Sequence, residues 1–204
     1  MSFYTGAIKT LGGFVRFILG IKSVQGLENI PKTGPALVCA NHTAFVDPII
    51  LAAAMRLPIK FMGKAELFKI PVLSFVIRSF GAFPVTRGGT DVTSLKTTVK
   101  LLKDGEFVGM FPQGTRCPHV APETTSVKSG AGLILSRAEC DVIPVYIKTK
   151  NNKAGFFKRT TVIIGKPIEY SSLGITEGIK REYDEASNKI FKTICELDKE
   201  KADK

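Results

Sequence analysis

Short apolar runs alternate with segments of helical periodicity along most of the chain. Residues 36–40 are continuously apolar and follow a turn that contains Pro31, Gly34 and Pro35, which predicts a buried strand. Further strands are predicted at residues 59–62, 82–86, 107–111, 142–148 and 161–164, and helices at residues 48–56, 66–80, 91–103, 129–139 and 176–199. Strands that alternate with helices predict a single α/β domain with a mostly parallel sheet flanked by helices.

The first 22 residues follow a different pattern. Apolar side chains recur there at helical spacing, namely Tyr4, Ile8, Leu11, Val15 and Ile18. Lys9 and Arg16 interrupt the segment, whereas a membrane span needs about 20 mostly apolar residues. We therefore predict an N-terminal amphipathic helix over residues 1–22 that lies in a membrane interface, followed by one domain over residues 23–204. The alternative is an ordinary first helix packed on the core.

A histidine and a carboxylate follow the first predicted strand. His42 and Asp47 lie in the segment that leaves residues 36–40, and the loops after the strands of an α/β sheet are where ligands usually bind. A carboxylate five residues after a histidine can meet it through a turn. It would then fix the imidazole tautomer and raise the basicity of the other ring nitrogen. The spacing is equally typical of a structural histidine and a helix-capping aspartate.

Cations follow two other predicted strands. Arg87 precedes two glycines, and Gly114, Thr115 and Arg116 follow residues 107–111. A guanidinium binds two phosphate oxygens at once, and a glycine lets the backbone approach a ligand closely. Lys128 stands at the start of the helix predicted at residues 129–139, where backbone N–H groups attract anions. Taken singly, each of these features is also typical of a turn with a surface cation.

Four sequence blocks, taken together and in this order, resemble the lysophospholipid and glycerol-phosphate acyltransferase family. They are Asn41-His42-x-x-x-x-Asp47, Gly81-Ala82-Phe83-Pro84-Val85-Thr86-Arg87, Phe111-Pro112-Gln113-Gly114-Thr115-Arg116 and Val142-Ile143-Pro144-Val145. The resemblance extends over residues 24–170 and implies that residues 23–204 form an acyltransferase domain. One residue departs from the family pattern, because Gln113 stands where the third block normally carries a glutamate.

The resemblance implies the reaction and its groups. His42 would deprotonate an acceptor hydroxyl while Asp47 orients the imidazole. The acyl donor would be a thioester of acyl carrier protein or coenzyme A, the acceptor 1-acylglycerol 3-phosphate, and the product phosphatidic acid, with no cofactor and no metal. Arg87 and Arg116 would hold the acceptor phosphate, helped by the lesser candidates Lys64 and Lys128.

Three alternatives stay open at this point. The acceptor could be glycerol 3-phosphate or another lysolipid. The chain could also be a lipid-binding relative of weak activity, because Gln113 keeps the shape of a glutamate but lacks its charge. Covalent catalysis by Cys117, with His119 two residues further on, would be a different chemistry.

The positive net charge of the chain indicates an anionic partner. It carries 29 Lys and Arg against 18 Asp and Glu, a formal net charge of +11. Nucleic acid, an anionic lipid surface and a phosphorylated substrate all fit that charge. The 14 phenylalanines fall mainly in apolar runs and tryptophan is absent, which disfavours nucleic acid as a partner. Four widely spaced cysteines predict neither a zinc site nor a disulfide framework. We therefore expect a peripheral protein at the cytoplasmic face of a membrane.

Overall fold

Strands from the whole length of the chain meet in one sheet. The computed structural model describes residues 13–199 except 72–73, 75–76, 79–80 and 86–91. Within these residues seven strands lie in the order β1-β7-β6-β2-β5-β3-β4. Their bounds are β1 Ile21–Gln25, β2 Ala36–Ala40, β3 Ile59–Lys64, β4 Phe83–Val85, β5 Phe107–Met110, β6 Val142–Thr149 and β7 Thr160–Ile164. Every neighbouring pair is parallel except β6 and β7, which run antiparallel.

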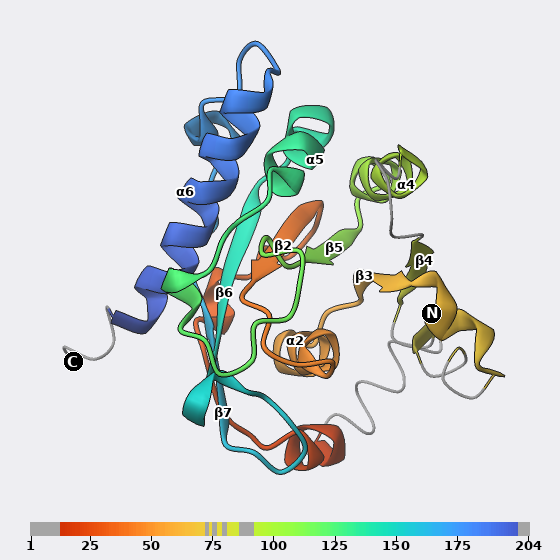
Figure 1. Ribbon diagram of the computed structural model, residues 1–204, viewed down its shortest axis with the longest axis vertical. Helices are drawn as coiled ribbons and strands as arrows, with labels where there is room; N and C mark the ends of the chain where they lie inside the picture. Colours follow the sequence, from red (N-terminus) through yellow and green to blue (C-terminus); the bar gives the residue numbers. More distant parts are fainter. Residues whose placement is uncertain (1–12, 72–73, 75–76, 79–80, 86–91, 200–204) are drawn as a thin grey trace.

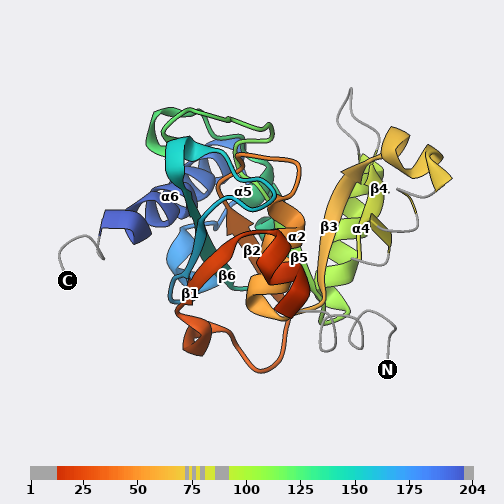
Figure 2. The same cartoon turned by 90° about the horizontal axis from the view of Figure 1, so that it is seen from below.

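Helices cover both faces of this sheet (Figures 1 and 2). Helix α2 (Asp47–Met55) packs on one face. Helices α4 (Val92–Lys103), α5 (Gly130–Ala138) and α6 (Lys180–Lys199) pack on the other face. Short 3-10 helices lie in the connections at Leu27–Asn29, Ala65–Lys69, Pro122–Thr124, Lys150–Asn152 and Tyr170–Leu173. The observed fold is the predicted α/β domain.

Strand β2 is the centre of the molecule. All five of its residues are buried, since β5 and β6 pair with its two edges and helices cover its two faces. Val38 packs in the core under α2, whereas Leu37 and Cys39 pack in the core under α4, α5 and α6. A strand buried on both faces needs apolar side chains at every position, which explains the continuous apolar run. The loop that leaves β2 is therefore held by a rigid strand.

Two elements differ from the sequence prediction. The helix expected at residues 66–80 begins as the 3-10 helix Ala65–Lys69, and part of its remainder lies outside the described residues. Strand β1 was not predicted, because its short sequence Ile-Lys-Ser-Val-Gln carries little strand signal of its own. It forms because β7 offers a parallel edge with which it pairs. A partner more than 130 residues away along the chain is invisible to a local pattern.

Only the end of the predicted N-terminal helix lies in the described part of the chain. Residues 13–18 are helical, and residues 1–12 fall outside. Leu19 and Ile21, which follow the helical turn, are buried in the core beneath α2. Among the described residues, no helix combines the length and the apolar character that crossing a membrane requires.

Candidate active site

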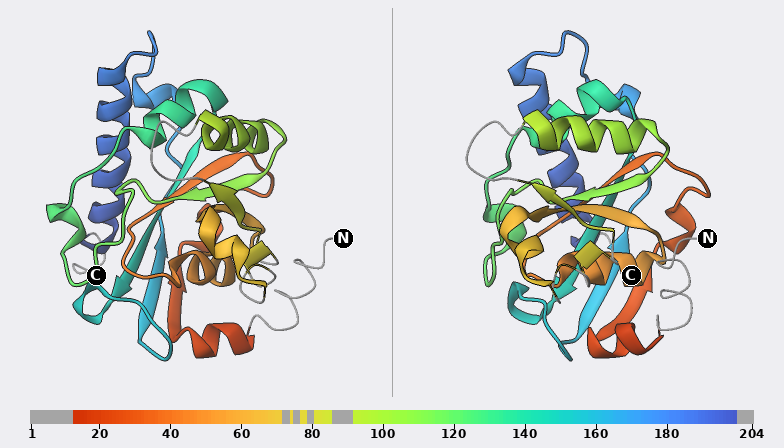
Figure 3. Two further views of the ribbon diagram at one scale, coloured as in Figure 1. Left: turned by 45° about the vertical axis from the view of Figure 1, so that its right-hand side comes forward. Right: turned by 90° about the vertical axis from the view of Figure 1, so that its right-hand side faces the viewer.

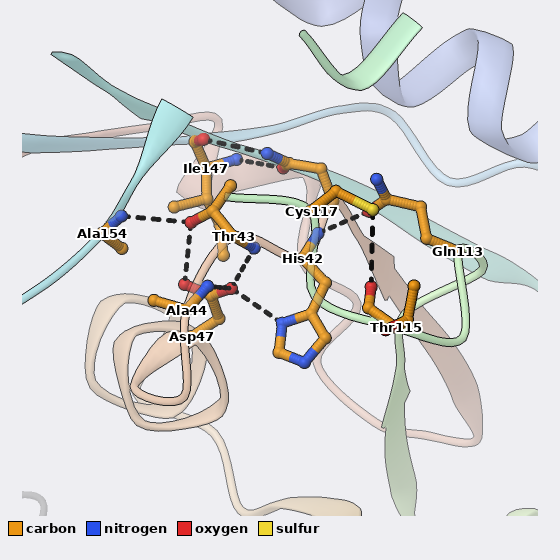
Figure 4. A network of polar contacts seen from close by, with 10 residues as sticks. His42, Thr43, Ala44, Asp47, Gln113, Thr115, Cys117, Ile147 and Ala154 are labelled. Atoms are coloured by element: carbon orange, nitrogen blue, oxygen red, sulfur yellow. Dashed lines mark hydrogen bonds and ion pairs between the residues drawn. The ribbon is translucent and has the colours of Figure 1, made fainter. Parts of the chain in front are cut away.

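His42 and Asp47 meet at the carboxyl end of β2. The Nδ1 atom of His42 lies 2.8 Å from Oδ2 of Asp47 (Figure 4). Asp47 is the first residue of α2, so a single tight loop between β2 and α2 joins the two side chains. The carboxylate can only accept a hydrogen bond from the ring, which places the imidazole proton on Nδ1. Nε2 is then the nitrogen that can take a proton from a substrate.

The Asp47 carboxylate is fully buried and is stabilised by several donors besides His42. Its Oδ2 atom accepts the backbone N–H groups of Thr43 at 2.6 Å and Ala44 at 2.7 Å. Its Oδ1 atom accepts the hydroxyl of Thr43 at 3.3 Å. Hydrogen bonds of this kind compensate a carboxylate for the loss of water. The same carboxylate therefore shapes the loop and orients the histidine.

The loop after β5 holds the main chain of His42 from the other side. The backbone N–H of His42 donates to Oε1 of Gln113 at 2.7 Å, and its carbonyl accepts the N–H of Cys117 at 2.8 Å. Gln113 is buried and donates through Nε2 to the Thr125 hydroxyl at 2.8 Å. The imidazole ring stacks on Phe111, with ring centroids 3.9 Å apart. Both the backbone and the ring of His42 are thereby fixed.

Asn41 and Thr43 tie the same loop to β6 and to the connection that follows it. Asn41 is fully buried and pairs with the backbone of Ile147, accepting its N–H at 2.7 Å and donating to its carbonyl at 3.1 Å. The Thr43 hydroxyl accepts the N–H of Ala154 at 3.1 Å. Strand β6 and the connection after it therefore hold the residues on both sides of His42.

An apolar cavity of about 370 Å³ opens beside the histidine. Most of its wall consists of apolar side chains, and His42 and Arg116 are its ionisable groups. The lining residues are His42, Phe45, Pro48, Ile49, Phe61, Met62, Gly63, Leu67, Ile77, Ala82, Gly109, Met110, Phe111, Gly114 and Arg116. Gly109 is required for this shape, since a Cβ there would lie 2.1 Å from the Phe61 ring. Such a wall suits a hydrocarbon chain with a polar head near His42.

The loop after β5 brings two of the predicted binding residues to the cavity, and Thr115 lies between them in the sequence. Gly114 and Arg116 line it, and Arg116 and Thr115 are exposed. Gly114 has a φ of 68°, in the left-handed region that favours glycine. A Cβ there would lie 2.8 Å from Cδ of Lys128, so the Lys128 side chain passes directly beside Gly114. Arg116 and Lys128 therefore belong to one loop cluster near His42.

The two other predicted cations, Lys64 and Arg87, are placed only by their positions along the chain. Lys64 ends β3, directly after the cavity-lining residue Gly63. Arg87 lies outside the described residues, two positions after the end of β4. Both remain predictions from the sequence as phosphate-binding groups.

The alternative thiol chemistry gains no geometric support at the described cysteines. Burial raises the pKa of the Cys39 thiol, and it raises the pKa of Cys140 to about 11, so both stay protonated. The Cys117 sulfur lies 3.8 Å from the Thr115 carbonyl, and the backbone N–H of His119 donates to Asn152. Within the described residues, no group of three or more His, Cys, Asp or Glu side chains is arranged to hold a metal ion.

Three contributors to the site were missed by the sequence prediction. Gln113 was noted only as a departure from the family pattern, and Asn41 and Phe111 only as parts of motifs. Gln113 and Phe111 contact His42, and Asn41 ties its loop to β6. A polar Asn after five apolar residues was a usable signal, because a buried amide needs partners. The position of Gln113 carried no such signal, since its two partners lie on other loops.

The fold and the site define an α/β protein in which a histidine–aspartate pair opens on an apolar cavity with a cation at its rim. Residues 22–148 match the model of the Acyltransferase family, and the chain belongs to that family as an acyltransferase enzyme. It is 31% identical over 185 residues to a Bacillus subtilis protein named 1-acyl-sn-glycerol-3-phosphate acyltransferase. That alignment covers 84% of this chain and 90% of the relative.

Other relatives carry the same name. One from Streptococcus pneumoniae is 30% identical over 172 residues, which cover 80% of this chain and 61% of the relative. The crystal structure of the 1-acyl-sn-glycerophosphate acyltransferase PlsC from Thermotoga maritima superposes with a TM-score of 0.67 and 24% identity. It covers 93% of this chain and 79% of that chain, and it bears out the fold.

Proposed function

We propose that the enzyme transfers a fatty-acyl group from a thioester of acyl carrier protein or coenzyme A to the free hydroxyl of 1-acylglycerol 3-phosphate. The product would be phosphatidic acid, a step of phospholipid biosynthesis. One observation carries the proposal: His42, with Nδ1 bound by Asp47, lines an apolar cavity that also exposes Arg116. The names of the relatives agree with this acceptor.

The proposed chemistry uses His42 as a general base. Nε2 removes the proton of the acceptor hydroxyl as its oxygen attacks the thioester carbonyl carbon. The tetrahedral intermediate collapses by breaking the carbon–sulfur bond, and the leaving thiolate takes the proton back from the imidazolium. Asp47 stabilises that imidazolium and keeps the ring in the productive tautomer. No acyl-enzyme forms.

Binding of the acceptor would combine the cavity with the nearby cations. The apolar wall accepts a fatty-acyl chain, and Arg116, Arg87, Lys128 and Lys64 hold the phosphate. Gly114 and Thr115 bring the backbone of the loop close to the bound head group. Because both substrates carry long chains, we propose a peripheral location at the cytoplasmic face of the membrane.

The decisive experiment is a product-resolved assay of the purified protein. Labelled acyl-coenzyme A and acyl carrier protein thioesters are offered with 1-acylglycerol 3-phosphate, glycerol 3-phosphate and a neutral lysolipid. We expect transfer to 1-acylglycerol 3-phosphate. Transfer only to another acceptor would reassign the substrate, and vesicle binding without turnover would indicate a lipid-binding relative.

Variants of the two histidines test the mechanism. His42→Ala should lower kcat by about 10²–10⁴-fold, the usual range for a general base, with an unchanged Tm. Asp47→Asn should be severely but less completely impaired. The control is Cys117→Ser with His119→Asn, which removes the alternative thiol pair, and asparagine tolerates the left-handed φ of 64° at His119. Near-normal turnover by His42→Ala, or loss of turnover in the control, would disprove the mechanism.

A further inference from the structure

Four phenylalanines are mostly exposed at one end of the molecule. Phe14 and Phe17 are 63% and 67% exposed on the helical turn of residues 13–18, and Phe156 and Phe157 are 60% and 69% exposed between β6 and β7. Single exposed apolar side chains are normal on soluble proteins, whereas a cluster of large ones marks an interaction site. We refer to these four side chains as the phenylalanine cluster.

Backbone hydrogen bonds hold the two halves of the cluster together. The N–H of Phe157 donates to the carbonyl of Ile18 at 2.7 Å, and the N–H of Thr160 donates to Gly20 at 2.9 Å. The rings of Phe17 and Phe157 meet edge to face with centroids 6.1 Å apart. The helical turn and the β6–β7 connection lie side by side at the lower end of the molecule in Figures 1 and 3. Phe17 and Phe157 therefore meet on one surface, and Phe14 and Phe156 belong to the same two segments.

The backbone of Phe157 adopts an unfavourable conformation. Its φ is 56°, in the left-handed region that bulky side chains rarely adopt. Strained conformations of this kind persist only where the surrounding structure holds them, and they concentrate at functional sites. A phenylalanine that is both strained and exposed contributes little to the stability of the fold itself.

The two segments are also uniformly basic. Residues 13–27 and 150–159 contain no aspartate or glutamate. Their cations are Arg16, Lys22, Lys150, Lys153, Lys158 and Arg159. Apart from Arg16, which is half-buried, all are exposed. Aromatic rings surrounded by cations match a bilayer with anionic head groups, since rings enter the interface and cations pair with phosphates.

The surface lies at the edge of the sheet where the active site opens. Ala40, the last residue of β2, is paired with Val145, and β6 continues beyond it to Thr149 before the connection begins. The N–H of Ala154 in that connection donates to the Thr43 hydroxyl, which in turn donates to Asp47. Contact with a membrane at the phenylalanine cluster would therefore hold His42 close to the lipid surface.

We propose that the β6–β7 connection, residues 150–159, is a membrane-docking loop, and that it forms one contact surface with Phe14 and Phe17. Its occupant is a phospholipid bilayer with anionic head groups. The bilayer would also supply the lipid acceptor, and in this respect the proposal rests on the proposed function. Its tests measure binding to vesicles that contain no acceptor, so they succeed or fail independently of turnover.

The first test uses the absence of tryptophan from the sequence. Phe157→Trp places the single tryptophan of the chain at the proposed contact with little change in size. Vesicles rich in phosphatidylglycerol should shift its emission to shorter wavelength, and brominated acyl chains should quench it. Val92→Trp on α4, where Val92 is 50% exposed, is the control and should not respond. Unchanged emission from the Phe157→Trp variant in saturating anionic vesicles would overturn the proposal.

The second test removes the rings without straining the backbone. Phe156→Ser with Phe157→Asn should weaken co-sedimentation with anionic vesicles by at least about tenfold. Asparagine tolerates the left-handed φ at position 157, so the Tm should not fall. The matched control is Val92→Ser with Ile179→Ser, which changes two exposed apolar side chains outside the two segments, at the first residue of α4 and at the residue before α6.

Two results would refute the docking loop. One is vesicle binding by the double phenylalanine variant equal to that of the control. The other is a concentration-dependent dimer of the natural chain that this variant abolishes, because the surface would then cover a second copy. Lys153→Glu with Lys158→Glu adds a third comparison, since reversed charge should weaken binding to anionic vesicles most at low salt.

Discussion

At the scale of single residues, the hydrogen bonds around His42 decide what the site can do. Asp47 binds the ring, and Gln113 binds the backbone N–H. The Thr125 hydroxyl accepts a hydrogen bond from the Gln113 amide and donates one to the Pro122 carbonyl. The neutral Gln113 side chain therefore forms a hydrogen bond with each of its two partners, the His42 N–H and the Thr125 hydroxyl. A glutamine at this position is therefore compatible with an ordered histidine, although it lacks the charge of the glutamate in the family pattern.

The proposed binding of the acceptor phosphate by cationic side chains gives a prediction for Arg116. Arg116→Ala should raise the KM for a phosphate-bearing acceptor by about tenfold or more and change kcat little, because it removes binding common to substrate and transition state. Steady-state kinetics with phosphate-bearing and neutral acceptors measure the difference. Arg181→Ala, an exposed arginine on α6, is the control. An equal loss of activity on both kinds of acceptor would show that Arg116 does not bind the acceptor phosphate.

At the scale of elements, the contact between α5 and α6 depends on one glycine. A Cβ at Gly132 would lie 2.3 Å from the carbonyl oxygen of Tyr183, and the N–H of Gly132 donates to the Ser187 hydroxyl. Gly132→Ala should lower the free energy of unfolding by about 1–3 kcal/mol through overpacking. Gly130→Ala in the same helix is the control, since its Cβ would meet only Met110 at an ordinary 3.7 Å. Equal urea midpoints for both variants would contradict this packing.

The start of α6 gives a prediction about pH. The Glu182 carboxylate accepts hydrogen bonds from the backbone N–H groups of Glu177, Gly178 and Thr176 and from the Thr176 hydroxyl. These hydrogen bonds, foremost the one from Glu177, lower the pKa of Glu182 to about 2. A depressed carboxyl pKa stabilises the fold above the ordinary value near 4.5, and that contribution is lost as pH falls from there toward 2.

Glu182→Gln should therefore lower the urea midpoint at pH 7. The difference from the natural chain should narrow below about pH 4.5. Glu185→Gln is the control, because Glu185 forms only an exposed ion pair with Arg181. A difference that stayed constant between pH 7 and pH 3 would show that the charge of Glu182 is not the stabilising feature.

At the scale of the whole molecule, the division at residue 22 remains a prediction. A truncation that tests membrane anchoring must end before Leu19, because Leu19 and Ile21 are core residues. Deleting residues 2–12 should reduce turnover on an acceptor in vesicles and spare turnover on a short, soluble analogue. Deleting residues 2–20 should instead lower the Tm, since it removes Leu19. If the shorter deletion also lowers the Tm and both activities, the segment is a helix packed on the core.

The sequence by itself determined the class of fold and the family, and it predicted the site residues. Periodicity is local, so apolar runs such as residues 36–40 identify strands wherever both faces are buried. The His42–Asp47 spacing was also local, because five residues of loop suffice to bring the two side chains together. The four motif blocks then indicated the acyltransferase family.

Only the tertiary structure decided which distant residues contact His42 and the loop that carries it. Gln113 reaches His42 across 71 residues of sequence, and Asn41 reaches Ile147 across 106, because β5 and β6 flank β2 in the sheet. Strand β1 exists because β7 pairs with it, and the same pairing brings Phe17 against Phe157. Contacts of this kind depend on the order of strands, which no local pattern of apolar and polar positions encodes.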